Sequence, residues 1–301
     1  MRSLFEFAEG TAPRVTVLMS VYNGERYISE AVSSILAQSF SDFEFLIFDD
    51  ASTDKSLEII KNFADPRIRV TENSTRKGLA TNLNQGIREA RGEYVARMDG
   101  DDISMSHRLA RQVAFMDANP DLGASGTYAV DMNDAGSDLK MHKVRHGRAL
   151  EQWIWMPSPM IHPTVIFRKS IIHKFGGYDA SLRAAQDYDL WLRLNSVGIK
   201  LDNLPEVLLR YRIHSQNVTK SNRADQLLTT YRIFKRQYPQ TRLSYEEFKS
   251  LILEDFIVSP WRRYRHLRRL TRMGTFSFAL AKNTIRYAIG WGGQHIREMS
   301  I

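Results

Sequence analysis

The first 130 residues alternate between short apolar runs and longer stretches in which apolar residues recur every three or four positions. The runs Val15–Val21, Phe43–Phe48 and Tyr94–Met98 have the β-branched and aromatic content that is typical of buried strands. Between them, the three-or-four spacing predicts amphipathic helices over about 27–36 and 79–90. Strands that alternate with helices form βαβ units, so this pattern predicts an α/β fold with a mainly parallel, Rossmann-like sheet.

The rest of the chain is less regular. Two further apolar runs, Thr164–Arg168 and Val207–Ile213, predict strands, and residues 187–197 predict a short helix between them. Short mixed elements after a parallel half fit a sheet that is extended by antiparallel strands. From about residue 222 the pattern becomes helical and basic, so we expect C-terminal helices after the sheet.

Polar residues stand directly after three of the predicted strands. They are Tyr22-Asn23, Asp49-Asp50 and Asp99–Asp102. In an open parallel sheet the carboxyl ends of the strands lie at one edge, and ligands bind just beyond that edge. We therefore expect these three groups, although far apart in the sequence, to form one ligand site.

Several carboxylates at one sheet edge repel one another and need a counter-charge. A divalent cation, Mg²⁺ or Mn²⁺, is the simplest one, because both ions prefer oxygen ligands. In the pair Asp99-x-Asp101, one carboxylate can reach the metal while the other accepts a hydrogen bond from a ribose hydroxyl. Two plainer interpretations stay open: a solvated Asp-Gly-Asp turn, and capping of the helix after Asp49-Asp50 by Ser52 or Thr53.

Composition and absent motifs exclude several kinds of chemistry. The chain has 301 residues and no cysteine, so disulfides, thiolate metal sites and cysteine nucleophiles are excluded. Neither a P-loop nor a Gly-x-Gly-x-x-Gly loop follows the first strand, so ATP hydrolysis and dinucleotide redox chemistry lack their usual phosphate cradles. The N-terminus has no signal-like apolar segment, and no run approaches the roughly 18 apolar residues of a membrane span, which predicts a cytoplasmic protein.

The net charge of +8 is concentrated near the C-terminus. Residues 261–301 contain nine basic residues and one acidic residue, so their net charge of +8 equals that of the whole chain. Aromatic and aliphatic residues lie between the arginines. Such a composition suits a helix on an anionic membrane surface. A helical appendage packed on the rest of the protein and a nucleic-acid patch are the alternatives. We expect peripheral attachment to the inner face of the cell membrane, and no nucleic acid partner.

Four segments together resemble the family 2 glycosyltransferases, which have a GT-A type fold. In order within residues 13–215 they are VTVLMSVYNGERYISEAVSSILAQSFSDFEFLIFDDASTD, RKGLATNLNQGIREARGEYVARMDGDD, HPTVIFRKS and GGYDASLRAAQDYDLWLRL. The resemblance implies an inverting enzyme that uses Mn²⁺ or Mg²⁺ and a nucleotide-diphosphate sugar, usually a UDP-sugar. It also implies transfer to a hydroxyl of a glycan or lipid-linked acceptor, in bacterial surface-polysaccharide or lipopolysaccharide assembly.

The resemblance implies roles for the residues that bind the donor. Asp49, with Asp50 beside it, is similar to the acid that contacts the nucleotide base, and Asp99 is similar to the residue associated with ribose. Arg76 lies on a glycine-flanked loop where it can reach a phosphate, with a solvated loop as the alternative. The complete set of expected donor-binding residues is Tyr22, Asn23, Asp49, Asp50, Arg76 and Asp99.

The same resemblance implies the metal ligands and the catalytic base. Asp101 matches the metal-binding residue of the Asp-x-Asp motif, and His214 resembles a histidine that completes the metal or diphosphate site in some members. Asp187 matches the general base, although Gln186 replaces the usual Glu before it. Asp189 is the competing carboxylate, and its plainer interpretation is a first-turn acid that faces the helix dipole.

The expected organisation is a GT-A type domain over 1–221 followed by a basic helical extension over 222–301. The domain divides into a nucleotide-sugar half, about 13–130, and an acceptor half, about 131–221. Two other function classes stay open. A sugar-phosphate nucleotidyltransferase is also α/β with metal-binding acids, but usually carries a glycine-rich phosphate loop where this chain has Ser20–Gly24. A basic nucleic-acid-binding protein would explain the charge but not the clustered acids.

Overall fold

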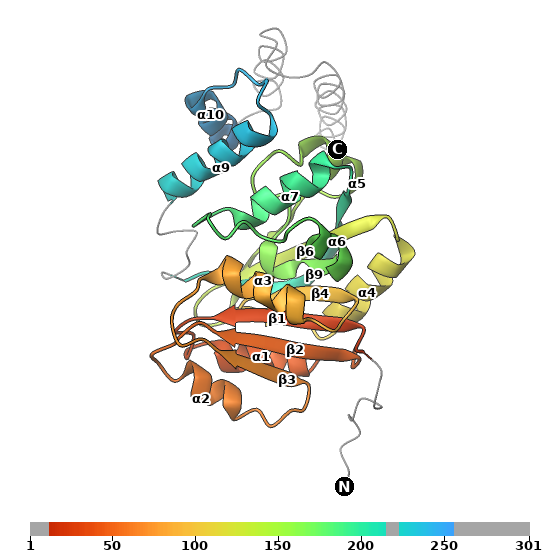
Figure 1. Cartoon of the computed structure of the whole chain (residues 1–301), viewed down its shortest axis with the longest axis vertical. Coiled ribbons are helices and arrows are strands. Elements are labelled where there is room, and N and C mark those ends of the chain that lie inside the picture. The colour runs from red at the N-terminus through yellow and green to blue at the C-terminus, as the bar shows by residue number, and fades with distance from the viewer. Residues whose placement is uncertain (1–11, 215–222, 256–301) are drawn as a thin grey trace, which may run out of the picture.

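The structure is a computed structural model that describes residues 12–214 and 223–255 (Figure 1). The segment 261–301, for which membrane docking is predicted, lies outside the described residues. In chain order the elements are β1 (Val15–Val21), α1 (Ile28–Leu36), β2 (Phe43–Asp49), α2 (Ser56–Lys61), β3 (Ile68–Glu72), α3 (Leu79–Glu89), β4 (Tyr94–Met98), β5 (Ile103–Ser104), α4 (Arg108–Ala118), β6 (Leu122–Met132), β7 (Asp138–His142), α5 (Gly147–Trp153), the 3₁₀ turn η1 (His162–Thr164), β8 (Ile166–Arg168), α6 (Lys169–Lys174), α7 (Gln186–Ser196), β9 (Lys200–Arg212), α9 (Arg223–Gln237) and α10 (Tyr245–Asp255).

The described strands form one mixed sheet in the order β3-β2-β1-β4-β8-β6-β9-β5, with β7 paired to β6. The first four strands in this order are parallel to one another. Strand β8 joins them antiparallel to β4, and β6 is antiparallel to β8 but parallel to β9. The prediction of a parallel α/β half extended by antiparallel strands is therefore confirmed, as are the helices that follow the sheet.

The strand register brings the predicted polar groups to one edge. Val21 at the end of β1 lies opposite Asp49 at the end of β2, and Met19 lies opposite Met98 at the end of β4. The residues that follow these positions therefore emerge at the same edge of the sheet, because parallel strands end on the same side.

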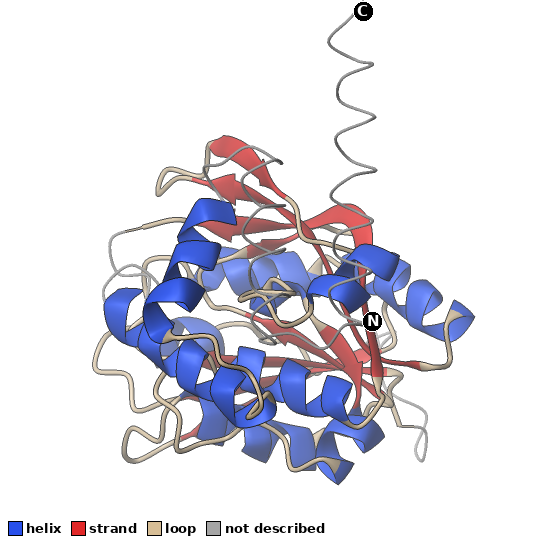
Figure 2. Ribbon diagram, turned by 90° about the horizontal axis from the view of Figure 1, so that it is seen from above, coloured by secondary structure: helices blue, strands red, loops and turns tan. Residues whose placement is uncertain are grey.

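Helices cover both faces of the parallel half (Figure 2). Alternate residues of a strand point to opposite faces, and β1 follows this rule. Val17 and Met19 pack in the cluster that contains the buried residues of α1 and α4, whereas Leu18 packs in the cluster that contains Leu83 and Ile87 of α3. The parallel strands whose ends form the polar edge therefore lie between two apolar layers.

Strand β6 was not predicted from the sequence, although it is central to the second half of the sheet. Its sequence, LGASGTYAVDM, is rich in small residues and lacks a strong apolar run. The small residues are required by packing: a Cβ atom on Gly126 would lie 2.3 Å from Oδ1 of the Asn203 side chain, and one on Gly123 would lie 2.4 Å from Ile199. Because close packing leaves room only for small residues, the strand lacks the large apolar side chains by which strands are normally identified in a sequence.

The C-terminal helices pack on the acceptor half through a separate apolar cluster. Phe234 of α9 and Phe248 of α10 are buried together with Trp155, which precedes the 3₁₀ turn η1. Figure 1 shows α9 beside α7, and the two helices are in contact. No helix within the described ranges is long and apolar enough to cross a membrane.

Candidate active site

The turn after β4 gathers three carboxylates. One oxygen atom from each of Asp99, Asp101 and Asp102 lies within 4.8 Å of the others, which is close enough for one metal ion. Asp102 is 1% exposed, and its Oδ2 atom has no hydrogen-bond partner in the described part of the chain. Burial, together with the charges of Asp101 and Asp99, raises the pKa of the Asp102 carboxyl well above its ordinary value. A buried carboxylate oxygen without a donor suits a hard divalent cation, so the residues present fit Mg²⁺ or Mn²⁺.

The end of β9 supports this turn. His214 Nε2 lies 2.8 Å from Asp101 Oδ2, although 113 residues separate the two. The backbone N–H of Arg212 donates a hydrogen bond to Asp102 Oδ1 at 2.8 Å, and its guanidinium donates one to the Asp101 carbonyl oxygen at 2.8 Å. The structure thus brings together the two residues that the sequence predicts as metal ligands, Asp101 and His214.

Arg97 is a buried cation next to the acidic turn, and sequence reasoning missed it. Its side chain is 4% exposed, and both terminal nitrogens pair with the Asp99 carboxylate. Its Nε atom has no hydrogen-bond partner among the described residues. Burial raises the pKa of Asp99, and the Arg97 charge opposes this rise. The alternation of β4 was an available signal, because Arg97 and Asp99 are two positions apart and so share one face of the strand.

Asp187 reaches the same site from the acceptor half. It lies in the first turn of α7, two residues after Ala185, whose backbone is left-handed with φ 57°. The charge of Asp187 contributes to the raised pKa of both Asp99 and Tyr178, so these groups are electrostatic neighbours. Burial raises the pKa of Asp187 itself, and this effect exceeds the lowering by nearby N–H groups and by Arg97.

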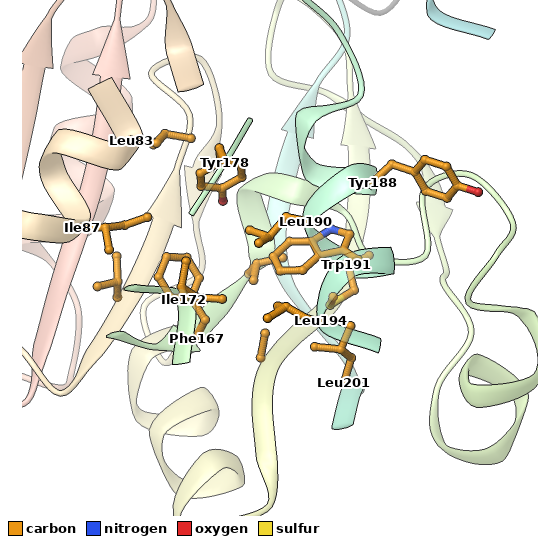
Figure 3. Close-up of a cluster of buried hydrophobic side chains, with 14 of the residues drawn as sticks. Leu83, Ile87, Phe167, Ile172, Tyr178, Tyr188, Leu190, Trp191, Leu194 and Leu201 are labelled. Atoms are coloured by element: carbon orange, nitrogen blue, oxygen red, sulfur yellow. The ribbon is translucent and has the colours of Figure 1, made fainter. Parts of the chain in front are cut away.

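Asp189, the competing carboxylate, is fully buried in an ion-pair network. Its Oδ2 atom accepts a hydrogen bond from Arg193 Nε at 2.8 Å, and its Oδ1 atom pairs with Arg236 of α9. The Oδ1 atom therefore joins α7 to α9, whereas the bond to Arg193 lies within α7. Figure 3 shows Tyr178 between Leu83 of α3 and the α7 side chains, at the boundary between the two halves.

Three of the predicted donor-binding residues keep groups available to a ligand. The Tyr22 ring is 39% exposed, and the guanidinium of Arg76 stacks over it, 3.9 Å from the ring centroid. Asp49 is buried and accepts a hydrogen bond from the Ser52 backbone N–H at 3.0 Å. Its other oxygen, Oδ1, has no partner within the described ranges. An aromatic ring, a cation and an unpaired carboxylate oxygen at one sheet edge can bind a nucleotide.

Asn23 and Asp50 instead build the loops around this site. Asn23 has φ 51°, and its Oδ1 atom accepts a hydrogen bond from the Thr53 backbone N–H at 2.8 Å. Asp50 accepts hydrogen bonds from the backbone N–H groups of Lys77 at 2.8 Å and Gly78 at 2.9 Å. These bonds fix the loop that carries Arg76. The Asn23 side-chain oxygen and the Asp50 carboxylate are therefore used to fix these loops.

The expected capping of the second helix by Ser52 or Thr53 is wrong. Helix α2 begins at Ser56, whose backbone N–H donates a hydrogen bond to Asp54 Oδ1 at 2.9 Å. Ser52 instead accepts a hydrogen bond from the Asn23 backbone N–H at 3.0 Å. The hydroxyl and amide groups that follow β2 are used to join the loops after β1 and β2, a contact between distant segments that local sequence does not reveal.

The mixed sheet, with an acidic turn after β4 and Asp187 of α7 as an electrostatic neighbour of that turn, is the arrangement expected for a GT-A type transferase. Residues 16–176 match the profile of glycosyl transferase family 2. The chain is 37% identical to EpsE of Bacillus subtilis (strain 168), over 67% of this chain and 74% of that protein. The chain therefore belongs to glycosyl transferase family 2 and is a glycosyltransferase.

Two further relatives have more descriptive names. The O-antigen biosynthesis glycosyltransferase WbnJ of Escherichia coli is 34% identical, over 69% of this chain and 82% of WbnJ. The UDP-Glc:alpha-D-GlcNAc-diphosphoundecaprenol beta-1,3-glucosyltransferase WfgD of Escherichia coli is 27% identical, over 84% of this chain and 90% of WfgD.

Solved structures support the fold. TarS residues 1–349 of S. aureus, in complex with UDP-GlcNAc, has a TM-score of 0.63 and 18% identity, covering 85% of this chain and 80% of that one. The mannosyltransferase PcManGT of Pyrobaculum calidifontis, in complex with GDP-Man and Mn²⁺, has a TM-score of 0.62 and 20% identity, covering 93% of this chain and 81% of that one. Both are GT-A glycosyltransferases, so the predicted fold type is confirmed.

Proposed function

We propose that the protein is an inverting, metal-dependent glycosyltransferase that moves a sugar from a UDP-sugar to a hydroxyl of a lipid-linked glycan acceptor during assembly of a bacterial surface polysaccharide. One observation carries the proposal: the charge of Asp187, from the acceptor half, acts on Asp99 of the acidic turn Asp99–Asp102, from the nucleotide-sugar half. An inverting transfer needs both features: a cation-binding group that stabilises the leaving diphosphate, and a base on the acceptor side.

The donor assignment rests on the residues at the sheet edge. The exposed Tyr22 ring, the Arg76 guanidinium and the free Asp49 oxygen suit a base and a diphosphate. Asp99 accepts a hydrogen bond from ribose, and Arg97 holds that carboxylate in place. The names of WfgD, with UDP-Glc, and of TarS bound to UDP-GlcNAc favour a UDP-sugar, whereas PcManGT bound to GDP-Man supplies the competing donor.

In the reaction, an acceptor hydroxyl oxygen attacks the anomeric carbon while the bond from that carbon to the diphosphate breaks. The configuration inverts, because the displacement occurs in one in-line step. Asp187 accepts the proton of the hydroxyl. Asp101 and His214 would hold a cation, Mn²⁺ or Mg²⁺, and that cation would supply the positive charge that neutralises the diphosphate. The products are the elongated glycan and a nucleoside diphosphate.

The acceptor and the location rest on relatives and on charge. WfgD is named for an acceptor that is linked to diphosphoundecaprenol, and WbnJ for O-antigen biosynthesis. A lipid-linked acceptor lies at a membrane, and the net charge of +8 in residues 261–301 would attract the protein to an anionic inner surface. Liposome co-sedimentation of the full chain and of a truncation near residue 258 tests this, and equal pelleting of both would contradict it.

The test of the function is a donor screen. UDP-Glc, UDP-GlcNAc and GDP-Man are each added to the full chain with Mn²⁺ or with EDTA, and the melting temperature and nucleoside diphosphate release are measured with and without a GlcNAc-diphospholipid acceptor. We expect a UDP-sugar to raise the melting temperature only with Mn²⁺, and the acceptor to accelerate UDP release. Binding of no nucleotide sugar, together with RNA binding at moderate salt, would overturn the proposal in favour of the nucleic-acid alternative.

A further inference from the structure

The position of Asp187 is set by helix α7. The residue stands in the first turn of α7, and the N–H groups that lower the pKa of its carboxyl, those of Tyr188 and of Asp187 itself, belong to the same turn. Any displacement of this turn would therefore move the carboxylate with it. The two residues that follow Asp187, Tyr188 and Asp189, connect α7 to its surroundings.

The polar connection runs from α7 to α9. Arg236 of α9 pairs with the fully buried carboxylate of Asp189, and the same guanidinium lies 3.6 Å from Asp179. Asp179 belongs to residues 177–185, the segment that leads from the Gly176-Gly177 turn into α7; we call it the approach segment. One side chain of α9 thus contacts both the approach segment and the first turn of α7.

The other partner of Asp189 cannot replace this contact. Arg193 lies on α7 itself, four residues after Asp189, so its ion pair is internal to the helix. Its guanidinium also donates hydrogen bonds to the carbonyl oxygens of Phe175, at 2.8 Å, and of Gly177. Arg193 therefore anchors the beginning of the approach segment. Only Arg236, of these two arginines, links Asp179 of that segment to a different helix.

An apolar connection runs in parallel. Figure 3 shows Tyr188 pointing away from the cluster around Trp191. Its hydroxyl donates a hydrogen bond to the carbonyl oxygen of Trp155, and the Trp155 ring packs on Phe234 of α9 at a centroid distance of 6.1 Å. Phe234 is 2% exposed. Helix α9 therefore supports both residues that follow Asp187, one by charge and one by packing.

We propose that helix α9 is a positioning element of the active site, and that Arg236 holds the approach segment and the first turn of α7 so that Asp187 stays aligned with the acceptor hydroxyl. The proposal rests on the proposed function, in which Asp187 is the base. Arg236 touches no reacting group. The element lies beyond residue 176, where the family profile ends, so it belongs to the part of the chain that the profile does not cover.

The test replaces Arg236 with methionine, which removes the charge but keeps an unbranched apolar stem. Lys249→Gln is the matched control, because Lys249 of α10 pairs with Glu246 of the same helix, at 3.6 Å, and both side chains are exposed. We expect R236M to lower kcat for transfer about tenfold, since small displacements of a catalytic group are costly. The affinity for UDP with Mn²⁺ should stay within about twofold, because the donor residues come from other elements. R236K should recover part of kcat.

A second readout does not depend on activity. Hydrogen exchange of the amides in the approach segment and the first turn of α7 should be faster in R236M than in the wild type and in K249Q. Faster exchange with wild-type kcat would overturn the positioning role. Unchanged exchange would show that Arg236 does not hold the approach segment and the first turn of α7. A parallel loss of UDP affinity and transfer would also overturn the proposal, because it would indicate general destabilisation. If the wild type transfers no sugar while the amides of R236M exchange faster, the proposed function has failed. The structural role of Arg236 in holding these two segments then still stands.

Discussion

The nucleotide-sugar half and the acceptor half are held together by different interactions. In the first, backbone ladders between parallel strands and two apolar layers fix the sheet edge, and the donor residues stand at strand ends. In the second, the β6–β9 ladder is supplemented by side chains that bind backbone groups outside the sheet. Asn203, for example, donates hydrogen bonds to the carbonyl oxygens of Arg145, at 2.6 Å, and Pro159, at 2.8 Å. Irregular buried backbone requires such partners, since unpaired polar groups are costly.

This difference has a consequence for the site. The donor residues take their positions from the regular sheet, so single substitutions there change contacts to the ligand and leave the scaffold in place. Asp187 takes its position from α7, which is joined to its neighbours by Asp189 and Tyr188. We therefore expect substitutions on the two sides to separate donor binding from transfer, and the following predictions test that separation in order of decreasing effect.

Asp187→Asn should give the largest effect. The amide keeps the shape of the side chain but cannot accept the hydroxyl proton, so transfer should fall about 1000-fold while UDP affinity stays within about twofold. Transfer kinetics and calorimetry with UDP and Mn²⁺ measure the two quantities. Asp121→Asn is the control, because the Asp121 side chain is 71% exposed and, within the described ranges, forms its ion pair with Lys200 at the surface. Near-wild-type turnover of D187N would remove Asp187 from the role of base.

Asp101→Asn should act on the donor side. We expect the affinity for UDP in the presence of Mn²⁺ to fall about 100-fold, because one charged metal ligand is lost, with little change in affinity when EDTA is present. Calorimetry under both conditions gives the comparison. Asp138→Asn changes an acid of β7 that pairs with Arg210 and should change neither value. Equal metal dependence in D101N and the wild type would contradict the metal assignment.

Gly126→Ala tests the packing of the acceptor half. The new Cβ atom would lie 2.3 Å from Asn203 Oδ1, and Asn203 is 1% exposed and bound to two carbonyl oxygens, so it cannot move freely. We expect the free energy of unfolding to fall by about 2 kcal/mol in urea denaturation. Gly136→Ala isolates backbone strain, because a Cβ atom at this position would have no atom within 4 Å while φ is +81°. We expect this variant to lose about 1 kcal/mol of unfolding free energy. A larger loss in G136A than in G126A would show that collision is not the dominant cost.

The two halves should also respond differently to pH. Burial raises the pKa of Asp187, so transfer should fall about tenfold per pH unit below a midpoint that lies above the ordinary aspartate value of about 4. Asp50 behaves oppositely: burial would raise its pKa, but hydrogen bonds from Asn82, Lys77, Gly78 and Asn73 outweigh burial and lower it. Its stabilising contribution is therefore present above the ordinary value and is lost only as the pH falls through the lowered pKa.

The pH comparison requires two measurements on the same protein. The rate of transfer is followed from pH 8 downward, and the melting temperature is recorded over the same range. We expect the rate to fall before the melting temperature does. If both fall together, loss of structure rather than protonation of the base limits transfer at low pH.

Much of the nucleotide-sugar half was predictable from the sequence, for a physical reason. Three of its strands, β1, β2 and β4, are buried on both faces, so their sequences are continuous apolar runs, and its helices carry one apolar stripe each. Asp49, Asp99 and Asp101 follow directly from those strands, so locating the strand ends also located the acids. The local sequence pattern therefore predicted the fold class and the sheet edge at which these acids lie.

Only the tertiary structure decided the rest. Strand β6 is built of small residues because neighbouring side chains occupy the space, and that space is defined by segments far away in the chain. The contacts of His214 with Asp101 and of Arg97 with Asp99 depend on register and burial, which determine whether a charge is solvated or paired. The link from Arg236 to Asp189 joins helices that share no sequence motif. Residue types and spacing determined which groups were available, and packing determined which of them meet.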